Sequence, residues 1–107
     1  MLKLCSAMMA LGLSLSVSAT ELVIETWRVE DAKLWQEQIL PSFHARYPDI
    51  TVKLTPVPSS EYQATVMQRL ADDKAGDLIT CRPFDASLEL FNKGKLADLS
   101  AMPAMAN

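Results

Sequence analysis

Three short apolar runs alternate with three segments of helical periodicity, and this alternation most constrains the fold. The runs are rich in β-branched and aliphatic residues typical of buried strands, and they occupy residues 22–27, 49–55 and 77–81. Each run precedes a helical segment. Strands that alternate with helices predict parallel pairing, with the crossover helices packed on the sheet. The sequence therefore predicts an α/β fold.

The first helical segment carries a stripe of large apolar side chains, which predicts that it packs on the sheet. The stripe recurs every four residues at Trp35, Ile39, Phe43 and Tyr47, one turn after Ala32. Glu30 or Asp31 is expected to cap its start. Pro41 lacks a backbone N–H, so we expect a kink or break there, and Pro48 should end the helix.

The second helical segment lies between a serine pair and a glycine. Ser59 or Ser60 is expected to cap its start, and Gly76 to end it. Its inner face is predicted to comprise Tyr62, Val66, Arg69 and Leu70.

The third helical segment spans residues 83–94, with Pro83 near its first turn and Gly94 at its end. Leu88 and Phe91 are expected to point inward.

The first nineteen residues resemble a secretory signal peptide. Lys3 precedes an uncharged apolar stretch from Leu4 to Val17, and small residues end at Ala19. The stretch is too short for a good membrane-spanning helix, although an uncleaved N-terminal anchor is the alternative. We expect cleavage after Ala19.

Cleavage would remove Cys5 and leave Cys81 as the single cysteine, which excludes an internal disulfide. Cys81 lies in an apolar run, so burial is expected, with a reactive thiol as the alternative.

The charge of the chain disfavours nucleic acid as a partner. The 107 residues carry a net charge of −3 and no run of basic residues. Phosphate binding needs a basic face, which this sequence does not offer. The composition, 50% hydrophobic, suits one ordinary soluble domain.

Several stretches occur in an order and spacing typical of one family. They are a strand that ends in Trp27, FHARYPDITVKL (43–54), Tyr62 early in a helix, AGDLIT (75–80) and LFNKGKLADLS (90–100). Together they resemble the N-terminal part of the extracellular solute-binding proteins of ABC importers, in the sugar-binding family that includes maltose-binding protein. The Gly-x-x-Pro-Asp that this family carries before the third strand is matched only at Asp77.

The resemblance implies a fold and a function. Residues 20–107 would form the opening βαβαβα units of a periplasmic-binding-protein lobe, with a parallel sheet and helices on both faces. The lobe would be incomplete, since family members are several times longer and bind their ligand between two lobes. The implied protein is a truncated or partial periplasmic component of sugar transport. Its partners would be a sugar or related small polar solute and the ABC permease subunits in the membrane.

Candidate ligand-binding residues follow the three predicted strands, because ligands of open parallel sheets bind beyond the carboxyl ends of the strands. Sugars need aromatic faces for their C–H surfaces and polar side chains for their hydroxyls. The candidates are Trp27, Arg28, Glu30, Asp31, Tyr62, Arg82 and Asp85, with Phe84 as a further ring. The alternative role is core packing for Trp27 and Tyr62. It is simple solvation for Arg28 and Arg82, and helix capping for Asp85.

No motif indicates an enzyme, a metal site or a cofactor. His44 is the single histidine and lacks neighbouring ligands, and the serine pair at Ser59 has no nucleophile context. Glu30 and Asp31 are adjacent, which does not place them across a substrate. We expect a binding protein that is not an enzyme.

The sequence also permits two other interpretations of this chain. The chain is either a stand-alone secreted α/β domain for protein interaction or sensing, or a non-functional truncated product. On its own we expect it to pack loosely or aggregate and to show no sugar affinity measurable by calorimetry. The third strand would have an open outer edge beside Leu78 and Ile79.

Overall fold

The computed structural model describes residue 12 and residues 19–105. The predicted signal peptide, residues 1–19, therefore lies almost wholly outside the described residues. Three strands are present: β1 (Thr20–Thr26), β2 (Ile50–Pro56) and β3 (Leu78–Ile79). The main helices are α1 (Ala32–Leu34), α2 (Leu40–Arg46), α3 (Ser59–Ala71) and α4 (Asp85–Asn92), and a 3-10 turn spans Pro103–Met105.

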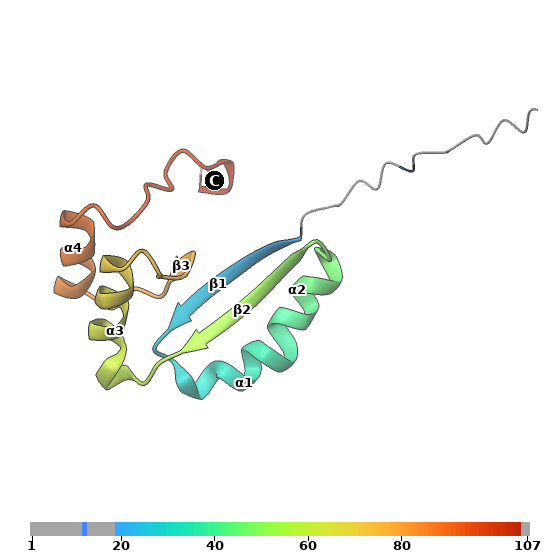
Figure 1. Ribbon diagram of the computed structural model, residues 1–107, viewed down its shortest axis with the longest axis horizontal. Coiled ribbons are helices and arrows are strands. Elements are labelled where there is room, and N and C mark those ends of the chain that lie inside the picture. The colour runs from blue at the N-terminus through green and yellow to red at the C-terminus, as the bar shows by residue number, and fades with distance from the viewer. Residues whose placement is uncertain (1–11, 13–18, 106–107) are drawn as a thin grey trace, which may run out of the picture.

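The strands form a parallel sheet in the order β2-β1-β3, which confirms the α/β prediction (Figure 1). β1 pairs with β2 along its whole length, from Thr20↔Ile50 to Thr26↔Pro56. β3 is shorter than predicted and pairs only at Ile24↔Leu78 and Glu25↔Ile79. Just before β3, the Asp77 N–H donates to the Val23 carbonyl and the Asp77 carboxylate accepts the Val23 N–H, both at 2.8 Å.

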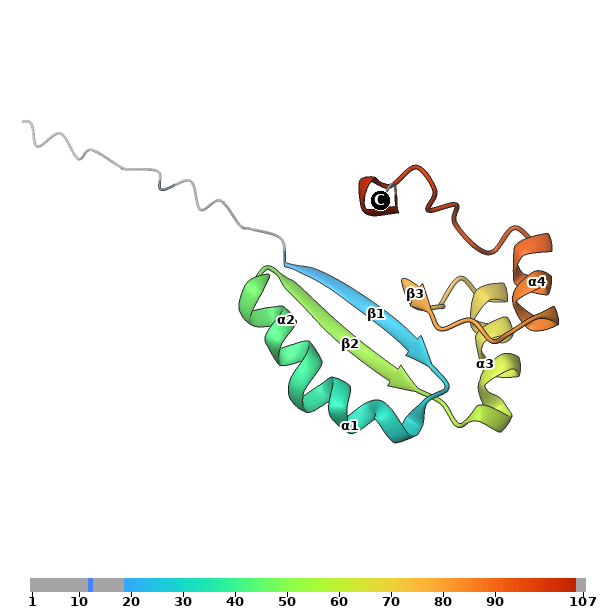
Figure 2. The ribbon, with the colours of Figure 1, turned by 180° about the vertical axis from the view of Figure 1, so that it is seen from behind.

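Helices cover both faces of the sheet. α1 and α2 run along β1 and β2, whereas α3 and α4 lie beside β3 (Figures 1 and 2). Beneath the helical segment 35–43, which includes the first part of α2, apolar side chains from this segment and all three strands line a cavity of about 140 Å³. On the other face, Val57, Tyr62 and Val66 form a buried cluster with Trp27, Leu70 and Ile79 packed against it.

The first helical region is continuous through Pro41, so of the two predicted outcomes, a kink or a break, the break is wrong. A 3-10 turn at Val29–Asp31 leads into α1, and a π-helical turn at Trp35–Ile39 joins α1 to α2. In that turn the Leu40 N–H bonds to the Trp35 carbonyl, five residues back. The wider turn accommodates the proline ring within the helix.

Of the two predicted ends of this helical region, the C-terminal one is confirmed and the N-terminal cap is wrong. Tyr47 is the C-terminal cap, so Pro48 follows the end as predicted. Neither Glu30 nor Asp31 caps the start through its side chain, because the chain enters the helix through the 3-10 turn. Tyr47 is 44% exposed and packs on Phe43 at 4.9 Å between ring centroids.

The predicted limits of α3 are wrong. Its N-cap is Pro58, and no side chain caps the helix. It ends at Ala71, well before Gly76, because Asp73 adopts a positive φ of 54° and the Lys74 N–H bonds to the Arg69 carbonyl at 2.8 Å. A left-handed residue just beyond a helix, with this bond, closes its last turn.

In α4 the inward residue is Leu90, which is 2% exposed, and not Leu88 or Phe91, which are 54% and 68% exposed. The helix is too short for the spacing of three apolar residues to indicate which side faces the sheet. Its end is as predicted: Gly94 has a φ of +67°, and Lys95 N–H bonds to the Leu90 carbonyl. No helix in residues 19–105 is both long and apolar enough to cross a membrane.

Candidate functional site

The carboxyl ends of the three strands lie at one edge of the sheet, and each continues within a few residues into a helix. β1 leads through Trp27 and Arg28 into the first 3-10 turn, and β2 leads through Val57 into α3. The Val57 N–H bonds to the Thr26 carbonyl at 2.9 Å, which fixes these two strand ends together. The loop from β3 to α4 carries Arg82.

Trp27 is the centre of this edge. The guanidinium carbon of Arg28 lies 5.6 Å from its ring centroid, and that of Arg82 lies 5.2 Å away. Both distances are within the range of cation–π attraction. The ring is half-buried and also packs against the cluster of Val57, Tyr62 and Val66. Trp27 therefore packs against the core and lies at the edge, as its core-packing alternative predicts.

Three of the predicted residues form one charged group. Arg28 Nε donates to Asp31 Oδ2 at 2.6 Å, and its terminal nitrogen lies 3.4 Å from Glu30 Oε1. The hydrogen bond to Asp31 and the two negative charges raise the pKa of Arg28. This exposed group holds the Arg28 guanidinium on the first loop.

Arg82 joins the third loop to the start of α3. Its terminal nitrogens donate to the Ser59 carbonyl oxygen at 2.5 Å and to Ser59 Oγ at 2.8 Å. The side chain is half-buried. The predicted alternative, a fully solvated arginine, does not fit these contacts.

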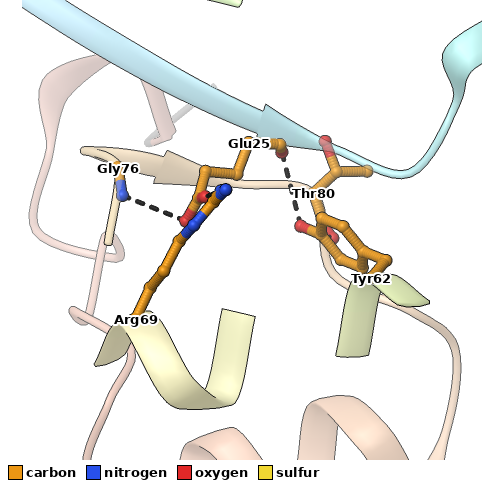
Figure 3. Close-up of polar contacts among 5 residues, drawn as sticks. All are labelled: Glu25, Tyr62, Arg69, Gly76 and Thr80. Atoms are coloured by element: carbon orange, nitrogen blue, oxygen red, sulfur yellow. Dashed lines mark hydrogen bonds and ion pairs between the residues drawn. The ribbon is translucent and has the colours of Figure 1, made fainter. Parts of the chain in front are cut away.

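Tyr62 lies behind the edge, in the core. It is 1% exposed, and its hydroxyl donates to the Thr80 carbonyl at 2.7 Å, with the Glu25 carbonyl at 3.3 Å (Figure 3). Burial, the nearby Glu25 charge and Cys81 together raise the pKa of Tyr62 to about 12. Tyr62 thus holds β1, β3 and α3 together, and its ring is not available to a ligand in this conformation.

Asp85, the last predicted residue, is the exposed first residue of α4. The N-cap is Phe84, with φ 57°, and no side chain caps the helix, so the capping alternative is wrong. Phe84 is 88% exposed. Cys81 is exposed, which corrects its predicted burial, because β3 ends before it and the chain turns outward.

A buried ion pair on the α3 face was not predicted. Glu25 is 1% exposed, pairs with Arg69 of α3, and accepts the Gly76 N–H at 3.0 Å (Figure 3). The signal in the sequence was a glutamate inside an apolar strand and an arginine on the inner face of a helix. The pair positions α3, which begins at Ser59, and the segment that leads into β3 at Gly76.

Metal binding finds no support at this edge. Among residues 19–105 no three His, Cys, Asp or Glu side chains gather in a way that would hold a metal ion. His44 lies on α2, where its Nδ1 is 3.1 Å from the Ile50 carbonyl oxygen.

Two solved structures share this fold. The apo form of RafE from Streptococcus pneumoniae matches with a TM-score of 0.69 and 23% identity, over 80% of this chain and 22% of that one. A sugar transporter from Rhizobium etli in an open conformation matches with a TM-score of 0.62 and 21% identity, over 77% and 21% of the two chains. The chain thus spans about a fifth of the length of each. No protein-family model and no curated protein matches the chain.

Proposed function

We propose that this chain is the opening part of the N-terminal lobe of the substrate-binding component of an ABC importer, and that the solute is a carbohydrate. The proposal is supported by the sequence resemblance and by the shared fold with a sugar transporter of which the chain covers about a fifth. In the whole protein, closure of two lobes around the solute would signal to the permease subunits. Export through the predicted signal peptide would place it in the periplasm.

One observation carries the proposal: at the carboxyl edge of the sheet the Arg82 guanidinium lies over the Trp27 ring, with its carbon 5.2 Å from the ring centroid. An aromatic ring together with charged N–H donors offers the two kinds of contact that a sugar needs, to its C–H face and to its hydroxyls. Ligands of open parallel sheets bind at this edge.

Uptake measurements in the source strain test this function in the protein as the cell makes it. Deletion of the gene should abolish uptake of one radiolabelled carbohydrate at limiting concentration and leave unrelated solutes unaffected. Trp27→Ala at the native locus should weaken binding by roughly 1–3 kcal/mol if the ring stacks on the sugar, and so reduce uptake.

The control variant is Trp35→Phe, because Trp35, the first residue of the π-helical turn, lines the apolar cavity and not the carboxyl edge. It should leave uptake unchanged. Normal carbohydrate uptake in the deletion strain would refute the proposal. It would favour a secreted protein-interaction domain, for which the exposed apolar side chains of Phe84, Leu88 and Phe91 are suited.

A further inference from the structure

Arg82 differs from the other half-buried arginine of the described residues in having no counter-charge. Arg69 pairs with Glu25, and the more exposed Arg28 pairs with Asp31 and Glu30. Within residues 19–105, no carboxylate oxygen lies within 4.0 Å of an Arg82 nitrogen. A guanidinium that is partly removed from water is stabilised by an anion, and the chain supplies none here.

The remaining donors of Arg82 are suited to such an anion. Its two hydrogen bonds to Ser59 use only some of the five N–H donors of the guanidinium. They also hold the side chain in one orientation, so that less conformational freedom is lost when a ligand binds. Carboxylates and phosphates match the planar fork better than a sugar hydroxyl does.

The positive end of α3 favours negative charge at Arg82, whereas this edge also carries acidic side chains: Glu30 and Asp31 on the first loop, Glu61 in the first turn of α3 and Asp85 at the start of α4. Ser59 is the first residue of α3, a helix of 13 residues whose positive end lies next to the guanidinium. The acidic side chains of Glu30 and Asp31, on the neighbouring loop, are held by Arg28. Asp85 lies three residues beyond Arg82 on the exposed start of α4, and no ion pair joins the two.

We propose that Arg82 binds an anionic oxygen group, a carboxylate or a phosphate, on a sugar whose ring lies against Trp27. The inference rests on the proposed function and specifies its substrate class: acidic or phosphorylated sugars in preference to neutral ones. In this complex Trp27 contacts the C–H face of the sugar, and Arg82 binds its negatively charged group.

Nuclear magnetic resonance of the nitrogen-15-labelled chain tests this preference, because chemical shifts report millimolar binding that is too weak for calorimetry. The sequence has two tryptophans, so the indole N–H of Trp27 is monitored and that of Trp35 serves as an internal control. The probes are glucose, glucuronate, glucose 6-phosphate and inorganic phosphate. We expect both charged sugars to shift the Trp27 signal at about tenfold lower concentration than glucose, as charge-assisted hydrogen bonds to arginine require. Comparison of the two charged sugars distinguishes a carboxylate from a phosphate ligand.

Arg82→Gln should remove the preference for charged sugars. Arg82→Lys should keep part of it, because lysine has the positive charge but not the planar guanidinium that binds two oxygens at once. Arg46→Gln is the matched control. Arg46 lies over the Tyr47 ring at 5.7 Å, likewise without an ion pair among the described residues, but at the far end of α2. It should leave the titrations unchanged. A dispersed spectrum for each variant establishes that it is folded.

Each contrary outcome overturns the inference in a recognisable way. Equal shifts by glucose and the charged sugars would refute the charge preference and leave the carbohydrate function intact. Phosphate acting as strongly as glucose 6-phosphate would indicate an adventitious ion only. If no probe shifts the Trp27 signal, the inference fails, whereas the uptake measurements decide the function independently.

Discussion

Glu25 of β1 and Arg69 of α3, 44 residues apart in the chain, form an ion pair on the covered face of the sheet. The two partners are unequally buried: the carboxylate side chain is 1% exposed and the arginine side chain 33%. Removing Arg69 should therefore destabilise the chain more than removing Glu25. An unpaired Arg69 can reach water, whereas an unpaired Glu25 cannot.

Arg69→Met should lower the free energy of unfolding by about 3 kcal/mol, because it leaves a buried carboxylate without its partner. Glu25→Gln should cost less, and the double variant should recover part of the Arg69→Met loss. Urea denaturation of the three variants measures these differences. A larger loss for Glu25→Gln than for Arg69→Met would contradict the stated asymmetry.

Gly76 is required by a close approach of two backbones. A Cβ at this position would lie 2.8 Å from the Val23 carbonyl oxygen and 2.9 Å from Glu25 Cγ. Gly76→Ala should therefore destabilise the chain by about 1–3 kcal/mol, as overpacking does. The control is Gly94→Ala, where a Cβ meets no atom within 4 Å and only the positive φ resists it. A smaller loss of stability at Gly76 than at Gly94 would argue against the contact.

Tyr62 should make stability depend on pH in the alkaline range. Its folded pKa is raised from 10.0 to about 12, mainly by burial, so the unfolded chain loses the phenolic proton first. The unfolded state then binds fewer protons than the native state, and stability falls as pH rises. The contribution is complete below pH 10 and is lost between pH 10 and about 12, at a slope approaching 1.4 kcal/mol per pH unit.

Thermal unfolding across this pH range measures the effect, and Tyr62→Phe should flatten the profile. Tyr47→Phe is the matched control, because Tyr47 is 44% exposed. An identical alkaline slope in the Tyr62→Phe variant would show that other groups cause the loss.

The outer edge of β3 should promote association. Leu78 is 53% exposed, and β3 stands at the end of the strand order, with no further strand beside it in residues 19–105. Open strand edges pair with other chains, and a lysine on the edge opposes this. We therefore expect concentration-dependent association in sedimentation velocity, and less of it for Leu78→Lys.

Leu34→Lys provides the comparison, because Leu34 is similarly exposed, at 47%, but lies on α1 and away from a strand edge. It should leave association unchanged. A wild-type chain that stays monomeric at all concentrations would remove the basis for this prediction.

The candidate site was predictable to the extent that it depends on chain order. Parallel strands place their carboxyl ends at one edge, which brings Trp27 and Arg82 to the same side. The contact of Arg28 with Asp31 follows from their local spacing. The bonds of Arg82 to Ser59, and the use of the Tyr62 hydroxyl inside the core, depend on how α3 sits against β3.

The sequence by itself determined the alternation of strands and helices, their parallel pairing and the end of α4 just before Gly94, because these depend on local periodicity and local backbone preference. Only the tertiary structure decided that Leu90, and not Leu88 or Phe91, is buried, and that Glu25 is a core residue. A spacing pattern describes one element alone. Burial, and the partner that makes a buried charge tolerable, are properties of elements distant in the chain that meet in space.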